Sequence, residues 1–301
     1  MLPEDKINES ELHPVNNQSR MFFIIGMPRS GTKLLRSLLN RHSDIYIPEL
    51  ETDFFPFLSS RMSVIGDCSR EESFNQLYSD LLSQPFFVYL TDADSLPDKV
   101  KWFGASKNFF PAQVFEALLR TVTNTLGNES ALIGDKSPDY INQMGTLTKH
   151  FPAARYIHIV RDVRDYSLSM NKAWGKNMIR AANAWARSVG ALQPYVSELG
   201  TKIIELRYED LLGETESEVR KICQFLSIEF QPDMLTLDKA TENLGDTKGL
   251  VEVVSGNVQK YKVALPVKKL ARIEKLSCNI LHIYGYEFTW GGSQSRLNFV
   301  Y

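Results

Sequence analysis

The segment that most constrains this chain is a glycine-containing loop between an apolar run and a helical pattern. Residues 21–25 read MFFII, residues 26–33 read GMPRSGTK, and leucines at positions 34, 35, 38 and 39 then share one helical face. A strand, a glycine loop and a helix in this order open many α/β domains that bind phosphate. Such a loop directs backbone N–H groups at one point beside the positive end of the helix dipole. The segment therefore predicts an anion site.

The side chains of this loop also suit an anion. Ser30 and Thr32 offer hydroxyl donors, and Gly31 lets the backbone approach a bound group closely. Positive charge comes from Arg29 and Lys33. A tight turn with a purely structural role is the alternative that these residues leave open.

The order of residues in the loop differs from that of a nucleoside-triphosphate P-loop. The P-loop pattern GxxxxGK[ST] places a lysine directly after the second glycine and a hydroxyl residue after the lysine. Here Thr32 precedes Lys33, and no hydroxyl that could hold Mg²⁺ follows the lysine. The loop is therefore expected to bind an anion without a metal.

Further along the chain, apolar strand patterns alternate with amphipathic helical patterns. We expect strands at residues 131–133, 156–160 and 202–206. We expect helices at residues 112–125, 181–199, 216–225 and 267–284. This alternation predicts an α/β fold, a three-layer α/β/α P-loop-like domain with a mostly parallel central sheet.

The 301 residues are enough for one large domain, which we expect over residues 21–290. Residues 1–20 contain no aromatic side chain and are expected to be a flexible leader, and residues 291–301 a tail. Residues 54–111 are rich in aromatic side chains and are expected to be irregular, as part of an acceptor-side insertion at 54–130. A lid over the sheet edge and ordinary helical packing both remain open for this segment.

A second candidate anion anchor follows the strand expected at 156–160. Arg161 comes at the strand end, and Ser169 lies eight residues further on, about two helical turns away. A guanidinium suits phosphate because its planar fork donates two hydrogen bonds and stays charged. A helix-capping network with Asp162 or Asp165 as the partner of the arginine is the alternative.

With these two motifs the chain resembles the PAPS-dependent sulfotransferases, which share a P-loop-like α/β fold. Their 5′-phosphosulfate loop is commonly written PxSGTT, and residues 28–33 here read PRSGTK, so that Lys33 replaces the second threonine. The arginine, followed by LLRSLLNRHSDIYIP, is similar to the branch that contains tyrosylprotein sulfotransferases and many bacterial enzymes. The resemblance implies PAPS as donor and PAP as product. Residues 29–33 would then hold the 5′-phosphosulfate, and Arg161 and Ser169 the 3′-phosphate.

Two further segments are similar to motifs of the same family. Residues 134–138 (GDKSP) resemble a loop whose lysine, here Lys136, lies near the sulfonate, and residues 206–211 (LRYEDL) resemble a segment whose tyrosine, here Tyr208, lies near the nucleotide. A solvated Lys136 and a structural Tyr208 are the alternatives. The resemblance covers about residues 21–212, beyond which residues 255–257 (SGN) are a candidate for closing over the cofactor.

Sulfonate transfer builds negative charge on the transferred group, so fixed cations are expected to provide most of the catalysis. Arg29 and Lys136 are the expected pair at that centre. The acceptor must lose a proton, and the tyrosylprotein branch has its basic glutamate just before a threonine, as in Glu51-Thr52 here. Glu51 is therefore the expected base with Glu49 in reserve, and a solvated loop acid is the alternative.

Composition limits the partners and the compartment. Lys plus Arg (34) and Asp plus Glu (36) give a net charge of −2, which argues against a nucleic-acid or polybasic membrane binder. Three cysteines without CxxC spacing and a polar first segment favour a cytoplasmic protein, and no apolar run reaches the ~18–20 residues that span a bilayer.

Three functions remain open at this stage. A sulfotransferase that uses a hydroxyl or amine acceptor, small-molecule or other, agrees best with the two anion motifs. A small-molecule kinase and a non-catalytic nucleotide-binding protein are the alternatives. The sequence does not identify the acceptor or the oligomeric state.

Overall fold

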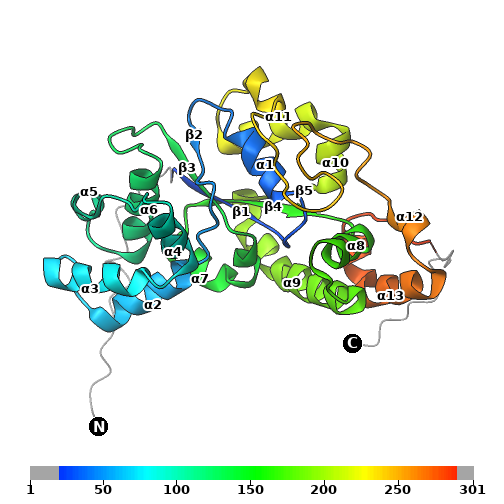
Figure 1. Cartoon of the computed structure of the whole chain (residues 1–301), viewed down its shortest axis with the longest axis horizontal. Coiled ribbons are helices and arrows are strands. Elements are labelled where there is room, and N and C mark those ends of the chain that lie inside the picture. Colours follow the sequence, from blue (N-terminus) through cyan, green and yellow to red (C-terminus); the bar gives the residue numbers. More distant parts are fainter. Residues whose placement is uncertain (1–19, 290–301) are drawn as a thin grey trace, which may run out of the picture.

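Five parallel strands form the sheet around which the other elements are arranged (Figure 1). The structure is a computed structural model that describes residues 20–289, so most of the expected leader (1–20) and the whole expected tail (291–301) lie outside the described residues. The strands are β1 (Met21–Ile25), β2 (Ile45–Tyr46), β3 (Leu132–Lys136), β4 (Arg155–Val160) and β5 (Ile203–Arg207). Their order is β2-β3-β1-β4-β5, and each adjacent pair is parallel. The predicted α/β fold with a parallel sheet is confirmed.

Helices cover both faces of the sheet, which gives three layers (Figure 1). One face packs on α1 (Thr32–Leu39), α10 (Tyr208–Gly213) and α11 (Thr215–Leu226). The opposite face packs on α7 (Met144–His150), α8 (Val163–Trp174), α9 (Met178–Leu199) and α13 (Val267–Ile283). Side chains of β1 alternate between the two cores: Phe22 and Ile24 contribute to one, Phe23 and Ile25 to the other. Burial on both faces explains why this strand is apolar throughout.

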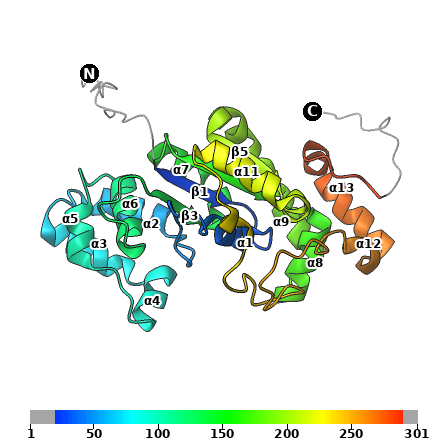
Figure 2. The ribbon, with the colours of Figure 1, turned by 90° about the horizontal axis from the view of Figure 1, so that it is seen from above.

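The aromatic segment after the first helix is helical, so the expectation of an irregular segment at 54–111 is wrong. It forms α2 (Phe55–Ile65), α3 (Glu71–Leu81), α4 (Pro85–Asp92), α5 (Lys99–Ala105) and the start of α6 (Pro111–Val122). These helices lie together at the β2 end of the sheet, and α8, α12 (Tyr261–Ala264) and α13 lie at the other end (Figure 2). Aromatic rings stabilise the group, because Phe54, Phe87 and Trp102 are each at most 1% exposed. The acceptor-side role of residues 54–130 stays a prediction.

Within residues 20–289, the remaining regular elements are three short 3₁₀ helices, Pro138–Asn142, Gly200–Lys202 and Pro232–Leu235. Residues 237–260, which we name the covering segment, form neither helix nor strand and connect the last of these to α12. Within residues 20–289, none of the helices has the length and apolar character that a membrane crossing requires.

The sheet topology determines where a ligand can bind. β1 lies between β3 and β4, and the chain leaves the carboxyl end of β1 toward one sheet edge and later returns on its other side. In open parallel sheets, ligands bind at the carboxyl ends of strands where the order reverses in this way. The glycine loop, Lys136 and Arg161 all follow or end these three central strands.

Candidate functional site

The glycine loop turns sharply between β1 and α1. Arg29 and Gly31 have φ values of 70° and 95°, in the left-handed region, and the Ser30 N–H donates to the Met27 carbonyl at 3.1 Å. Helix α1 begins at Thr32, and the first N–H groups of a helix have no partner inside it. A glycine is also needed at position 31 because the Tyr208 ring leaves no room for a side chain: a Cβ there would lie 2.3 Å from Cδ2 of Tyr208. The loop is therefore held open for an anion by glycine geometry and by the packed tyrosine ring.

Arg161 extends from the end of β4 to the glycine loop. Its Nη1 donates to the carbonyl of Arg29 at 3.0 Å, and its Nη2 donates to the carbonyl of Asn257 at 3.2 Å. The guanidinium carbon lies 4.5 Å from the ring centroid of Tyr208. Ser169 Oγ accepts a hydrogen bond from Arg29 Nε at 3.3 Å. The structure thus brings the two predicted anion anchors together on one side of the sheet.

Neither nearby aspartate forms an ion pair with Arg161. Asp162 pairs with Arg164 at 2.6 Å, and Asp165 accepts a hydrogen bond from the backbone N–H of Tyr261 at 2.9 Å. Arg164 also pairs with Glu274 at 2.6 Å. Across residues 20–289, Arg161 forms no ion pair, although only 6% of its surface is exposed. A helix-capping network is present, but it uses Arg164 and leaves Arg161 available to bind an anion.

The covering segment lies against the same two arginines. The carboxylate of Glu242 forms an ion pair with Arg29 Nη1, and the carbonyl of Leu244 accepts from Arg29 Nη2 at 2.9 Å. Asn257, in the segment predicted to close over the cofactor, donates from Nδ2 to the hydroxyl of Tyr208 at 2.7 Å. Glu242 was not predicted, since the surrounding sequence has neither a motif nor a helical period.

A second charged group lies at the end of β3. Lys136 Nζ forms an ion pair with Glu51, which comes from the loop after β2. The Lys136 side chain is buried, whereas the side chain of Glu51 is 37% exposed. Burial lowers the pKa of Lys136, and the nearby Glu51 carboxylate opposes that shift. The alternative of a solvated Lys136 on the surface is therefore wrong.

The two candidate bases, Glu51 and Glu49, differ in their ion-pair partners and in their environment. Glu49 is largely exposed and pairs with Lys239, and the hydrogen bond from that lysine lowers the pKa of Glu49. Asp53, which was not singled out, has its pKa raised to about 6 by partial desolvation and by the nearby carboxylates of Glu51 and Asp139. Because Asp53 directly follows Glu51-Thr52 in the sequence, it could have been predicted as a residue of the site.

The chemistry of the site fits a doubly anionic ligand. Across the part of the chain that the structure describes, Ser30 Oγ and Arg161 Nε are buried without a hydrogen-bond partner. Such atoms are rare in folded proteins unless a ligand or water satisfies them. Burial is the main cause that lowers the pKa of Lys136, and the nearby charge of Lys33 lowers it slightly further. The residues present therefore suit a nucleotide with two negatively charged ends.

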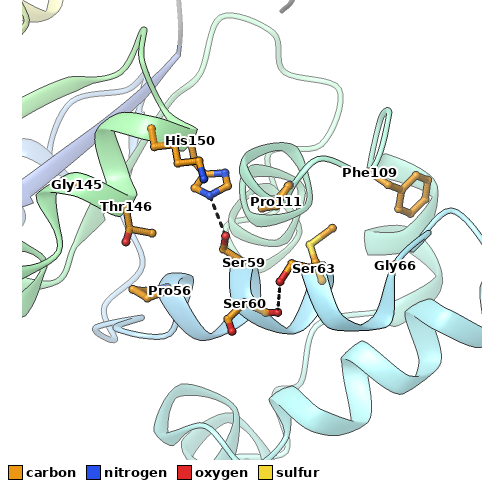
Figure 3. A pocket seen from close by; sticks show the side chains of 12 residues that line it. Pro56, Ser59, Ser60, Ser63, Gly66, Phe109, Pro111, Gly145, Thr146 and His150 are labelled. Carbon is orange, nitrogen blue, oxygen red and sulfur yellow. Dashed lines mark hydrogen bonds between the residues drawn. The ribbon is translucent and has the colours of Figure 1, made fainter. Parts of the chain in front are cut away.

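Two surface cavities lie apart from these arginines. One, of about 550 Å³, runs along α2 and α7, where Ser59 Oγ is 2.9 Å from Nε2 of His150 (Figure 3). Another, of about 620 Å³, is lined by Glu49 and Lys239 among others. Neither cavity is lined by Arg29, Arg161 or Lys136. Charge and strand ends, rather than cavity size, locate the candidate site.

The fold and this site define a P-loop-like α/β domain with cations at the ends of its three central strands. The model of the sulfotransferase family matches residues 22–232, and the chain belongs to that family.

Curated relatives agree with this assignment at low identity. Protein-tyrosine sulfotransferase 1 of Danio rerio is 23% identical over 227 residues, which are 73% of this chain and 56% of that protein. An uncharacterized protein of Aquifex aeolicus is 23% identical over 298 residues, which are 90% of this chain and 32% of that protein. The chain thus spans about half, or less, of the length of these two relatives.

Solved structures share the fold. The sulfotransferase domain of the Synechococcus PCC 7002 olefin synthase has a TM-score of 0.60 and 24% identity, covering 90% of this chain and 96% of that domain. The sulfotransferase domain from the curacin biosynthetic pathway has a TM-score of 0.57 and 22% identity, covering 89% and 98%. The part of this chain that aligns is therefore similar in extent to these two sulfotransferase domains.

Proposed function

We propose that this chain transfers a sulfonate group from PAPS to a hydroxyl or amine of an acceptor. The observation that carries the proposal is the hydrogen bond between Arg161 Nη1 and the carbonyl of Arg29 at 3.0 Å. It unites two anion anchors from different strands in one site. A donor with phosphate groups at two positions of one adenosine needs such a pair, and the family to which the chain belongs supports this donor.

The residues would divide the donor between them. Arg29 and the loop residues Ser30, Gly31, Thr32 and Lys33 would hold the 5′-phosphosulfate through backbone N–H groups, hydroxyls and charge. Arg161 and Ser169 would hold the 3′-phosphate, with Tyr208 packed beside both anchors. PAPS supplies an activated sulfonate whose leaving group is the 5′-phosphate of PAP. No residue of this arrangement needs a metal for its proposed role.

Glu51 is the proposed base. The acceptor oxygen or nitrogen forms a bond to sulfur while the sulfur–oxygen bond to the 5′-phosphate breaks, and the acceptor proton passes to the carboxylate. A glutamate carboxylate is too weak a base to deprotonate a free alcohol beforehand. Proton transfer must therefore accompany bond formation. The ion pair between Glu51 and Lys136 supports this role, because the proposed base lies beside a cation. Lys136 and Arg29 would offset the charge that develops on the transferred group.

The proposal extends to the class of acceptor and to the cellular compartment. A small molecule or another hydroxylated acceptor would approach from the side of Glu51 and the α2–α6 helices, and the cytoplasm is the proposed location. The relatives named as protein-tyrosine sulfotransferases are 21–23% identical to this chain, and a protein-tyrosine acceptor is not carried over from them.

Ligand-dependent stability tests the donor assignment. In the presence of EDTA, PAP at one hundred times its dissociation constant should stabilise the fold by about 2.7 kcal/mol. For a domain of this size that raises the melting temperature by about 5–10 °C. Mg·ATP should give no comparable shift, and a shift with Mg·ATP alone would favour a kinase. PAP binding without conversion of PAPS to PAP across a panel of hydroxyl and amine acceptors would favour a non-catalytic protein.

A further inference from the structure

A buried polar cluster lies directly beneath the ion pair of Glu51 and Lys136. We name it the Thr52 cluster; it consists of Thr52, Asp135, Ser137 and Tyr140, each at most 2% exposed. The hydroxyl of Thr52 donates to Asp135 Oδ2 at 2.5 Å, and the hydroxyl of Ser137 donates to Asp135 Oδ1 at 2.8 Å. Both carboxylate oxygens of Asp135 are therefore satisfied by hydroxyl groups.

The cluster also anchors the backbone of the loop that carries Glu51. Ser137 Oγ accepts from the backbone N–H of Thr52 at 2.9 Å and from that of Asp53 at 3.2 Å. Because the Thr52 hydroxyl donates to Asp135, the hydroxyl of Tyr140, 2.8 Å away, is its donor. Tyr140 in turn accepts from the backbone N–H of Phe55 at 3.1 Å, at the start of α2. The backbone N–H groups of residues 52, 53 and 55 are thus tied to side chains that follow β3.

Two tripeptides meet in this arrangement. Glu51-Thr52-Asp53 lies beside Asp135-Lys136-Ser137, so that the central residue of each contacts residues of the other. Thr52 contacts Asp135 and Ser137 inside the protein, and the buried Lys136 pairs with the partly exposed Glu51. Over residues 20–289, Asp135 forms no ion pair, although burying a carboxylate without a cation is unfavourable. A role in positioning explains why such a group is kept.

We propose that Asp135, acting through Thr52 and Ser137, is a positioning residue that fixes the Glu51 carboxylate relative to Lys136 and the acceptor. The inference rests on the proposed function, because it assumes that Glu51 is the base. Catalytic groups must be held within about 0.5 Å of the productive geometry by residues that are themselves locked by hydrogen bonds. The Thr52 cluster provides that support on the acceptor side, and none of its hydroxyls contacts Arg29 or Arg161.

The experiment removes one hydroxyl and leaves the shape of the side chain. In Thr52→Val, kcat for conversion of PAPS to PAP should fall about 10- to 100-fold, the order expected for a misplacement of about 1 Å. The assay uses the hydroxyl or amine compound of the panel that gives the highest rate of PAP formation. Where no compound gives a higher rate than water, water is the acceptor. The dissociation constant for PAP should stay within about twofold, since the donor anchors are untouched. Thr52→Ser, which restores the hydroxyl, should return most of the lost rate.

Thr215→Val is the matched control. The Thr215 hydroxyl donates to the carbonyl of Leu211 at 2.8 Å at the start of α11, on the face of the sheet opposite to the α2–α6 helices, and its loss should leave kcat unchanged. Ser137→Ala is the second variant, and it should lower kcat with unchanged PAP affinity in the same way. It keeps the test decisive if Thr52→Val does not fold.

Three results would overturn the inference while PAP still binds the wild-type protein. They are an unchanged kcat in both folded variants, no recovery in Thr52→Ser, and a loss of PAP affinity as large as the loss of kcat. The last would show that the cluster acts on the donor or on the whole fold. If wild-type protein does not bind PAP at all, the proposed function fails, and that outcome is visible before any variant is made.

Discussion

The proposed donor side and the proposed acceptor side of the site, named so below, hold their charges in different ways. On the donor side, Arg161 is bound by backbone carbonyls, and within residues 20–289 the ion-pair partner of Arg29 is Glu242 from the covering segment. On the acceptor side, Lys136 is matched by Glu51 from a loop that a buried cluster anchors. Backbone carbonyls orient a guanidinium without cancelling its charge, and an ion pair cancels it.

This difference is informative about what each side does. A site that must bind anions needs net positive charge, which the donor side keeps in Arg161. A reaction centre needs a base and a cation at fixed positions, which a supported ion pair provides. We therefore expect changes on the donor side to alter affinity and changes on the acceptor side to alter the rate of transfer.

Removing the proposed base should have the largest effect. Glu51→Gln keeps the size of the side chain but cannot accept the acceptor proton, so kcat should fall about 10²- to 10⁴-fold, the range for loss of a general base. The PAP dissociation constant, measured by titration calorimetry, should change little. Glu49→Gln is the matched control, because Glu49 pairs with exposed Lys239. Equal losses in both variants, or none in Glu51→Gln, would contradict the assignment.

Removing the donor-side arginine should shift affinity instead. Arg161→Ala takes away a buried cation that faces the proposed 3′-phosphate, so the PAP dissociation constant should rise about 30-fold or more, as for a lost partner of a buried charge pair at 2–5 kcal/mol. Arg155→Ala serves as control, because Arg155 begins the same strand and donates at 2.6 Å to the carbonyl of Leu226. A fall in kcat at saturating PAPS with unchanged PAP affinity would remove Arg161 from the donor site.

Much of the donor side could be predicted from the sequence, because it depends on strand ends. Apolar runs identified β1 and β4, and in a parallel sheet their carboxyl ends lie at the same edge. Arg29 and Arg161 were therefore expected together. The contact from Glu242 to Arg29 was not, since it joins positions 213 residues apart through a segment without regular structure.

The acceptor side and the α2–α6 helices were harder to predict. Aromatic composition obscured the helical period of α2–α5, although Pro56 and Pro85 mark first turns and Asp98 caps α5 through Val100 N–H at 3.0 Å. The Thr52 cluster was missed because tertiary packing, and not the local pattern, decides whether Thr52 and Asp135 are buried. Sequence patterns locate motifs, whereas the support of a catalytic group comes from contacts between them.

The buried carboxyl of the acceptor side should make stability depend on pH. Burial raises the pKa of Asp135 to about 7 from an ordinary value of 3.8, with hydrogen bonds from Thr52 and Ser137 opposing the shift. The folded protein therefore binds more protons than the unfolded chain between about pH 4 and pH 7. The free energy of unfolding should fall as pH rises through that window, by an amount on the order of 1–4 kcal/mol.

Denaturant unfolding of wild-type protein and Asp135→Asn at pH 5 and pH 8 measures this contribution. The asparagine variant cannot ionise, so its free energy of unfolding should fall less between the two pH values. Asp80→Asn is a suitable control, since Asp80 in α3 is partly exposed and pairs with Arg61 in α2 at 2.5 Å. If wild-type protein and Asp135→Asn have the same pH slope, Asp135 titrates at an ordinary pKa.

The smallest expected effect tests the carboxylate that pairs with Arg29 on the proposed donor side. Glu242 occupies Arg29 in the structure, and a bound 5′-phosphosulfate would need the same guanidinium. Glu242→Gln should therefore tighten PAP binding, but only about two- to fivefold, because ion pairs with partial exposure contribute about 0.2–1 kcal/mol. Glu252→Gln, an exposed change in the same segment, should leave the affinity unchanged. Weaker binding in Glu242→Gln would instead mean that this carboxylate helps to close the covering segment over the nucleotide. In that case both sides of the site would use an ion pair for positioning, and the contrast between them would rest on Arg161 alone.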